Sequence, residues 1–146
     1  MKLRFILVIA LLLIPILLLG GCTQTKCKVA DWQDISWKLK SYGPSNALQT
    51  VVGNASITLQ FNSNDNKIAG SGGCNHYFGS YTINNQNCEL KITGVGATKM
   101  ACADASIMQQ EQKYFNLLQA ASKIGVKDGE LRITSGSEVL IYTRNQ

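Results

Sequence analysis

The sequence predicts an α+β domain, built from a strongly curved, mostly antiparallel β-sheet or partial barrel with one main packed helix. Several short segments alternate polar and apolar residues, as half-buried strands do. One longer segment, residues 103–123, contains no Gly or Pro and carries apolar residues at helical spacing. Because strands come both before and after this single helix, we expect an antiparallel α+β arrangement.

The chain begins with a segment that is typical of an export signal. A short basic start is followed by residues 5–19, which are apolar and uncharged. This run suits a signal peptide and is short for a membrane-spanning helix, although an uncleaved anchor helix is the alternative. Leu19-Gly20-Gly21-Cys22 then resembles the bacterial lipobox, in which a peptidase cuts before the cysteine. We therefore expect residues 1–21 to be a lipoprotein signal peptide and Cys22 to carry the lipid that binds the membrane.

The remaining chain predicts a tether and one domain. Residues 22–30 are expected to form a lipidated tether, and residues 31–146 a single domain. Thr23, and not Asp, follows the expected lipidated cysteine, which by Gram-negative sorting rules favours the outer membrane, facing the periplasm. Loss of Lys2 and Arg4 would lower the net charge of +5 by two. Since no basic run with interleaved aromatics is present, we expect no nucleic-acid partner.

The strands expected before the helix are short segments of alternating polarity. In the clearest of them, Ile57, Leu59 and Phe61 share one face. The segments are residues 36–40, 56–61, 77–83 and 88–92. The turns between them, rich in Gly, Asn, Pro, Ser and Asp, are residues 42–46, 62–66 and 84–87, and Gly94 and Gly96 are expected to end the last strand.

The helix is expected to begin at Asp104 or Ser106, either of which can cap it. Glu111 falls on its apolar side, one turn from Met108 and from Phe115. Its carboxylate either reaches solvent from the edge of the buried stripe or caps or pairs with a group inside the fold.

Two hairpins are expected after Gly125. Asp128-Gly129 is a two-residue turn whose backbone matches strand twist, and it joins residues 124–127 to residues 130–134. A second turn at residues 135–137 leads to the last strand.

A glycine-rich segment, residues 70–81, is the most unusual part of the sequence. Backbone this dense in Gly can approach other backbone closely. A second motif, residues 97–102, follows it downstream in the sequence. We interpret the first as a backbone corner that its cysteine holds to the rest of the fold. The aromatic residues in and before it are expected in the core rather than around a ligand: Trp32, Trp37, Tyr77, Phe78 and Tyr81.

Five cysteines are present. If Cys22 carries lipid, four remain, which in an exported domain suggests two disulfides with three possible pairings. No Cys-x-x-Cys or zinc spacing occurs, so we expect no metal. We predict a disulfide between Cys74 and Cys102. We then predict a second between Cys27 and Cys88, because these are the two cysteines that remain. The first would contribute about 3–4 kcal/mol to stability if unstrained.

The sequence offers one combination of residues for catalysis. His76 is the only histidine and lies two residues after Cys74. A Cys–His nucleophile pair is therefore conceivable, but a disulfide cysteine beside a surface histidine fits an exported protein better. The glycine run lacks the Gly-Lys pattern of phosphate loops, and the aspartates lack a calcium-loop spacing. We expect no catalytic residues and no cofactor.

Several of these motifs, in order, resemble the META domain family, which includes the HslJ-like heat-shock lipoproteins of bacterial envelopes. The resemblance covers roughly residues 31–144. It rests on Trp37-Lys38-Leu39, the strand at residues 57–61, Gly70–Asn75 followed by Tyr77–Tyr81, Thr98–Cys102, and a helix bearing Glu111 and Tyr114. His76 departs from the pattern, in which Arg is expected.

The resemblance implies an envelope location, a link to stress or antibiotic tolerance, and no established catalysis. We therefore expect a non-catalytic envelope lipoprotein that acts by binding an envelope protein or lipid. The candidate binding residues are Asn75, His76, Tyr77 and Glu111. The alternative is a pilot or assembly lipoprotein that holds lipid or a partner's tail inside the barrel. An enzyme centred on Cys74 and His76 is a third, weaker hypothesis.

Overall fold

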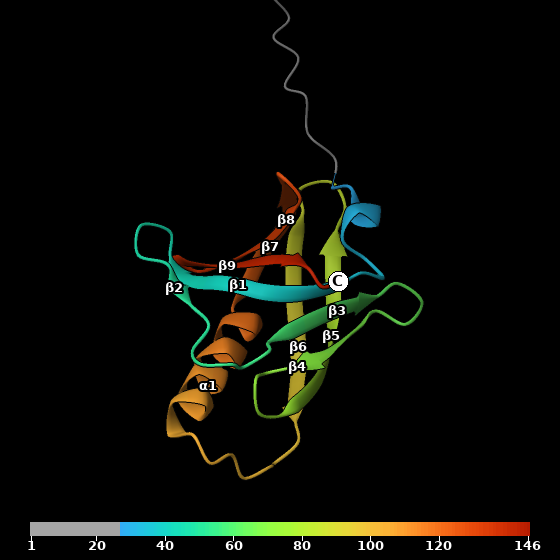
Figure 1. The fold of residues 1–146 in the computed structure, drawn as a ribbon. Helices are drawn as coiled ribbons and strands as arrows, with labels where there is room; N and C mark the ends of the chain where they lie inside the picture. The colour runs from blue at the N-terminus through green and yellow to red at the C-terminus, as the bar shows by residue number, and fades with distance from the viewer. Residues whose placement is uncertain (1–26) are drawn as a thin grey trace, which may run out of the picture.

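A computed structural model describes residues 27–146 as an antiparallel sheet closed on itself, with one packed helix (Figure 1). A short 3₁₀-helix, η1 (Val29–Asp31), precedes the sheet, and α1 (Ala105–Gln119) follows its sixth strand. The strands are β1 (Ser36–Pro44), β2 (Gln49–Thr50), β3 (Thr58–Asn62), β4 (Lys67–Ser71), β5 (His76–Asn84), β6 (Glu89–Ala97), β7 (Ala121–Lys127), β8 (Glu130–Ser135) and β9 (Glu138–Arg144).

Pairing of β1 with β9 closes the sheet. The strand order is β2-β1-β3-β4-β5-β6-β7-β8-β9, and β1 pairs with β9 from Trp37 opposite Arg144 to Pro44 opposite Glu138. The short β2 pairs only with β1 and lies outside this closure. The predicted α+β class, with a curved sheet or barrel and one main helix, is therefore confirmed.

The helix lies where two neighbouring strands of the barrel, β6 and β7, are barely paired. β6 and β7 pair only at Glu89 opposite Lys123, and α1 connects these two strands. Its contacts with β6 and β8 place it across this opening. The Asp104 carboxylate caps the helix, since it accepts a hydrogen bond from the Ser106 amide at 2.8 Å.

The helix is shorter than the sequence predicts. The expected segment extends to Lys123, whereas α1 ends at Gln119 and β7 begins at Ala121. Ala121 pairs with Ser135 of β8, so strand pairing prevails over a local sequence that contains no helix breaker.

Two strands extend through residues that the sequence assigns to turns or strand ends. Gly43 and Pro44 belong to β1 because they pair with Val139 and Glu138 of β9. Similarly, β6 continues through Gly94 and Gly96, and the latter lies opposite Phe78 of β5. In both cases long-range pairing prevails over turn-forming residues. The Asp128-Gly129 turn is confirmed, with φ angles of 55° and 78°.

The barrel interior is packed with large side chains. In β3, inward positions alternate with outward ones, with Leu59 and Phe61 buried between polar residues. Trp32 closes one end of this core, with its ring 4.8 Å from that of Phe61 in an edge-to-face arrangement. The largest fully buried side chains are Trp32, Trp37, Tyr77, Tyr81, Tyr114, Tyr142, Phe61, Ile57, Leu59, Ile68, Leu118 and Leu131.

The described chain begins already docked on the barrel. The Cys27 amide donates a hydrogen bond to the Asn85 carbonyl at 3.0 Å, and η1 follows directly. The end of the segment expected as a tether, residues 27–30, is thus part of the folded domain. The predicted signal peptide and Cys22 lie outside the described residues. Among residues 27–146, no helix has the length and apolar character needed to span a bilayer.

Candidate functional site

The glycine-rich corner forms the turn between β4 and β5. The Gly72 amide donates to the Asn75 carbonyl at 2.7 Å, and Gly73 adopts a φ of 108° that favours glycine. At Gly70 the backbone lies against the Thr58 carbonyl, where a Cβ atom would collide with it. The predicted corner is therefore present, and two of its glycines are required by conformation or by close backbone approach.

A buried carboxylate of α1 holds this corner. Glu111 is 6% exposed, and its Oε1 accepts hydrogen bonds from the backbone amides of Asn75 at 2.6 Å and Cys74 at 3.2 Å. Its Oε2 accepts from the Asn75 side-chain amide, also at 2.6 Å. Of the two roles open to Glu111 in the sequence, pairing inside the fold is therefore the one that the structure shows.

Asn75 joins the corner to the second motif. Its Oδ1 accepts hydrogen bonds from the Thr98 hydroxyl at 2.9 Å and from the Met100 amide at 2.8 Å. Its Nδ2 already donates to Glu111, so both the oxygen and the nitrogen of the side-chain amide are hydrogen-bonded within the domain. We infer that Asn75 and Glu111, which the sequence offers as binding residues, serve to hold the corner in place.

The predicted disulfide between Cys74 and Cys102 is present, with Cα atoms 6.1 Å apart. It links the corner to the same downstream motif that Asn75 contacts. Because the sulfur of Cys74 is bonded to that of Cys102, it is not a thiolate nucleophile in this state. The hypothesis of a Cys74–His76 catalytic pair therefore fails in the oxidised protein.

Tyr77, another candidate binding residue, points into the packed interior. Its hydroxyl donates to the Thr58 carbonyl at 2.8 Å and lies 2.8 Å from the Tyr114 hydroxyl, which in turn accepts from Tyr142 at 3.3 Å. Burial raises the pKa of all three tyrosines above the ordinary value of 10.0. We infer that Tyr77 serves the core, which leaves the exposed His76 as the candidate at the surface.

Phe78 differs most from the sequence prediction. It is expected in the core, yet 64% of its surface is exposed. Strand alternation explains this, because Tyr77 and Tyr81 point inward and the residue between Tyr77 and Gly79 must point outward. Its ring covers Gly96, where a Cβ atom would lie 3.0 Å from it. The period-two pattern of β5 was the signal that could have revealed this position.

A hollow of about 450 Å³ lies beside Phe78 on the outer face of the sheet. Phe78, Ile68 and Ala69 contribute its apolar part. Polar side chains contribute as well, and Lys67 and Ser80 are hydrogen-bonded to each other at 2.9 Å. An exposed aromatic ring beside hydrogen-bonding groups can bind a partly apolar partner, so we call this region the Phe78 hollow.

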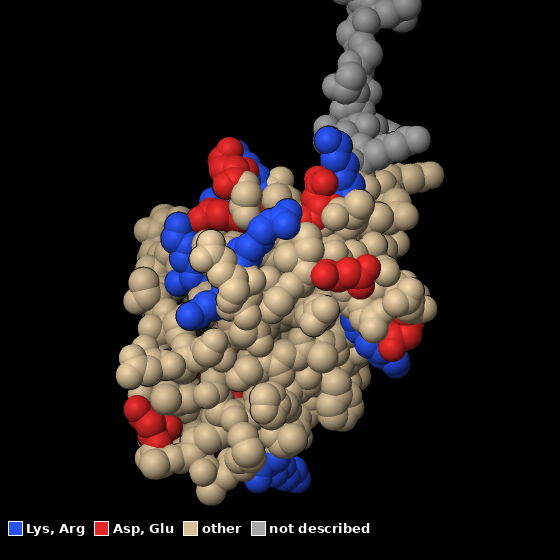
Figure 2. Space-filling view, turned by 45° about the vertical axis from the view of Figure 1, so that its right-hand side comes forward, with Lys and Arg blue, Asp and Glu red and all other residues tan. Residues whose placement is uncertain are grey.

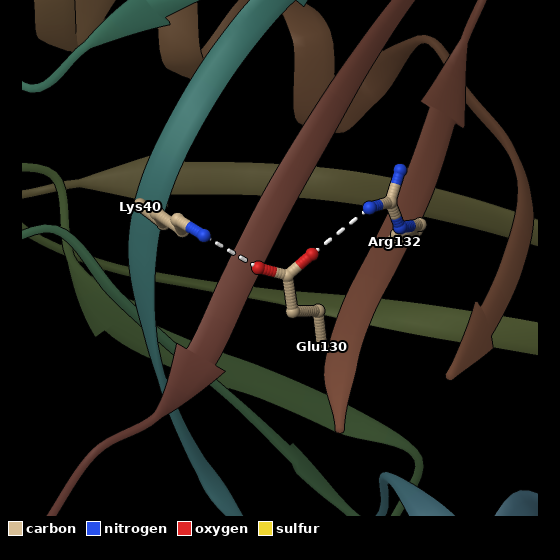
Figure 3. A network of polar contacts seen from close by, with 3 residues as sticks. All are labelled: Lys40, Glu130 and Arg132. Carbon is tan, nitrogen blue, oxygen red and sulfur yellow. Dashed lines mark hydrogen bonds and ion pairs between the residues drawn. The ribbon is translucent and has the colours of Figure 1, made fainter. Parts of the chain in front are cut away.

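The charged groups do not form a comparable site. Figure 2 shows that on one face the charged side chains, of both signs, gather toward the end where the described chain begins. On strands flanking β9, Glu130 accepts from Lys40 at 2.7 Å and from Arg132 at 2.9 Å (Figure 3). Lys40 and then Arg132 lower the pKa of Glu130, so these charges are paired with each other. Within residues 27–146, no group of three or more potential metal ligands occurs.

Together, these features define a small disulfide-linked β-barrel domain with one packed helix, whose glycine-rich corner is bonded to a buried helix carboxylate. The chain belongs to the META domain family, which matches residues 30–146. This confirms the resemblance inferred from the motifs. A search of curated proteins found no match.

Solved structures support the same fold. A protein from Burkholderia xenovorans, determined by NMR, has 26% identity and a TM-score of 0.65, with 78% of this chain and 83% of that chain covered. A second NMR structure has 22% identity and a TM-score of 0.58, with 78% of this chain and 92% of that chain covered. A DUF4847 family protein from Bacteroides vulgatus ATCC 8482 has 9% identity and a TM-score of 0.56, with 78% of this chain and 94% of that chain covered. The last two establish similarity of fold alone.

Proposed function

We propose that this protein is a non-catalytic envelope lipoprotein that supports envelope stress or antibiotic tolerance by binding an envelope partner through the Phe78 hollow. Cys22 attaches it by lipid to the outer membrane, and the domain faces the periplasm. The lipobox-like sequence and membership of the META domain family support this location. The bonded state of Cys74 supports the absence of nucleophilic catalysis.

One observation carries the proposal, namely the exposure of Phe78 beside a hollow on a barrel whose interior is packed. Burying an exposed aromatic ring against a partner removes a large apolar surface from water, and such rings often dominate binding energy. The packed interior argues against the alternative in which lipid or a partner's tail lies inside the barrel. A pilot or assembly role would therefore also use the outer surface.

Site-specific photocrosslinking in native membranes tests the binding surface. A photoreactive phenylalanine analogue at position 78 should yield a discrete adduct, whereas the same analogue at Thr143, an exposed position on β9, should not. Equal labelling at both positions, or none at position 78, would contradict the proposal. A secretion-machine protein in the adduct would favour the pilot role over general stress tolerance.

Complementation of a deletion strain tests the cellular role. Phe78→Ser should fail to restore survival under envelope stress, whereas Leu48→Ser, which removes another exposed apolar side chain, should restore it. Both variants should accumulate to wild-type levels. Full rescue by Phe78→Ser would contradict the proposal.

Membrane attachment is tested separately. Cys22→Ser should move the protein from the membrane fraction to the supernatant, and Cys27→Ser should leave it membrane-bound. Retention of Cys22→Ser in washed membranes would contradict lipid anchoring at this residue.

A further inference from the structure

A second pair of cysteines lies at the far end of β5 from the corner. Cys74 precedes β5, whereas Cys88 follows it, in the turn that leads to β6. The backbone brings Cys27 to this turn, because its amide donates to the Asn85 carbonyl at 3.0 Å. Cys88 is fixed as well, since its amide donates to Asn84 and its carbonyl accepts from Ile124 at 3.1 Å.

The side chains of these two cysteines also line the same cleft. Both residues are half-buried, and in this structure they are separate thiols. They line a cleft of about 250 Å³ together with Trp32, Asp31 and Val126. Burial, and then the neighbouring Cys88 thiol, raises the pKa of Cys27 to about 12. The Cys27 thiol is therefore protonated near neutral pH and reacts slowly once the domain has folded.

We propose that Cys27 and Cys88 form a second disulfide, which staples the start of the folded chain to the β5–β6 turn. Their place in one cleft, and the hydrogen bond from the Cys27 amide to the Asn85 carbonyl in the turn that contains Cys88, support this pairing independently of the count of cysteines. The Cys74–Cys102 bond of the same chain already requires an oxidising environment. Since both residues are half-buried in the folded domain, the reaction is expected during folding, when both thiols are accessible.

The oxidant is a disulfide, either of a thiol–disulfide oxidoreductase or of a small molecule such as oxidised glutathione. One cysteine, as thiolate, attacks a sulfur of that disulfide and forms a mixed disulfide, and one oxidant thiol leaves. The other cysteine, as thiolate, attacks the protein sulfur of the mixed disulfide and displaces the second oxidant thiol. Two protein thiols are thus oxidised to one disulfide, and the oxidant disulfide is reduced to two thiols.

The staple would keep the start of the folded chain on the barrel and so limit how far the domain can move from the membrane. This consequence rests on the proposed lipidation of Cys22. From Cys22 to Cys27 an extended chain reaches at most about 18 Å, whereas from Cys22 to the buried Trp32 it reaches at most about 36 Å. With the disulfide in place, the domain is therefore held close to the lipid surface by the end that carries Cys27.

Mass spectrometry of the full mature protein, extracted from its membrane, tests the bond directly. The protein is denatured and alkylated without reduction, and then digested with chymotrypsin, which cuts after Tyr81 and so separates Cys74 from Cys88. We expect a peptide containing Cys27 joined to one containing Cys88, lacking the two thiol hydrogens and unalkylated. The Cys74–Cys102 link is the internal control for oxidation.

Complete alkylation of Cys27 and Cys88 while the control link is intact would overturn the proposal, as would a link from Cys88 to either corner cysteine. The Cys88→Ser variant gives a second readout, because it should make Cys27 fully alkylatable without loss of the corner disulfide. An unchanged level of Cys27 alkylation in this variant would also overturn it. Neither measurement depends on the Phe78 hollow or on lipidation.

Discussion

The Glu111 carboxylate binds Asn75 through both of its oxygens, one accepting a hydrogen bond from the backbone amide and the other from the side-chain amide, each at 2.6 Å. The two residues are 6% and 9% exposed, so these hydrogen bonds are shielded from water. Hydrogen bonds to a charged acceptor are stronger than neutral ones, and a buried donor left without a partner is costly. This pair therefore fixes the glycine-rich corner against α1.

Glu111→Gln should lower the free energy of unfolding by about 1–3 kcal/mol. The new side-chain NH2 group would replace one of the two carboxylate oxygens. It would then oppose either the side-chain amide or the backbone amide of Asn75, each of which is a donor that loses its acceptor. Urea denaturation measures the change. Glu89→Gln is the matched control, because Glu89 is exposed on β6, and its midpoint should stay near that of the wild type. Equal midpoints for the two variants would show that the pair does not hold the corner.

Gly72→Ala should also destabilise the protein, by about 1–3 kcal/mol. An added Cβ atom would lie 2.5 Å from the Glu111 carboxylate and 2.7 Å from the Phe115 ring, so the helix or the corner must shift. Thermal or urea unfolding of this variant is compared with Gly125→Ala. The added methyl at Gly125 meets no atom within 4 Å, so that change should stay within about 1 kcal/mol. A neutral Gly72→Ala would contradict the close packing described for this turn.

Removal of the Cys74–Cys102 disulfide should reduce stability by about 3–4 kcal/mol, since the unfolded chain regains the freedom of the closed loop. The double variant Cys74→Ser/Cys102→Ser, studied by urea denaturation, avoids unpaired thiols. Unreduced wild-type protein provides the comparison. Reactive thiols at both positions in unreduced, mature protein would refute the assigned bond.

The buried tyrosines predict loss of stability in alkali. The pKa of Tyr77, Tyr114 and Tyr142 is raised above 10.0 by burial, so the folded state retains protons that the unfolded chain releases. Their contribution is complete below about pH 10, the ordinary tyrosine value, and falls as the pH rises above it. Phenolate absorbance and the unfolding free energy, followed together, measure this. Ionisation of every tyrosine near pH 10 without unfolding would contradict their burial.

The sequence predicted most of the fold because the relevant signals were local. Alternation marked residues 56–61 and 77–83, and Asp128-Gly129 marked its hairpin. The errors at Gly43 and at the end of α1 share one cause, since pairing with β9 and with β8 prevails over local preference at these places. Such pairings join segments far apart in the sequence and leave no local pattern.

The site was predicted less completely than the fold. Asn75, Tyr77 and Glu111 were predicted as candidate binding residues, yet their side chains are hydrogen-bonded within the domain, and only the spatial arrangement reveals that. Phe78 was assigned to the core because aromatic residues usually are buried there. Its outward direction follows from the alternation of β5, but the adjacent hollow depends on side chains of neighbouring strands that no local pattern brings together.

Amide hydrogen exchange at Asn75, measured by NMR in the oxidised protein, tests the central claim most directly. The account predicts strong protection of this amide in the wild type, because it donates to the buried Glu111 carboxylate, and a marked loss of protection in Glu111→Gln. Exchange of the Asn75 amide at the rate of an unstructured chain in the wild type would contradict it.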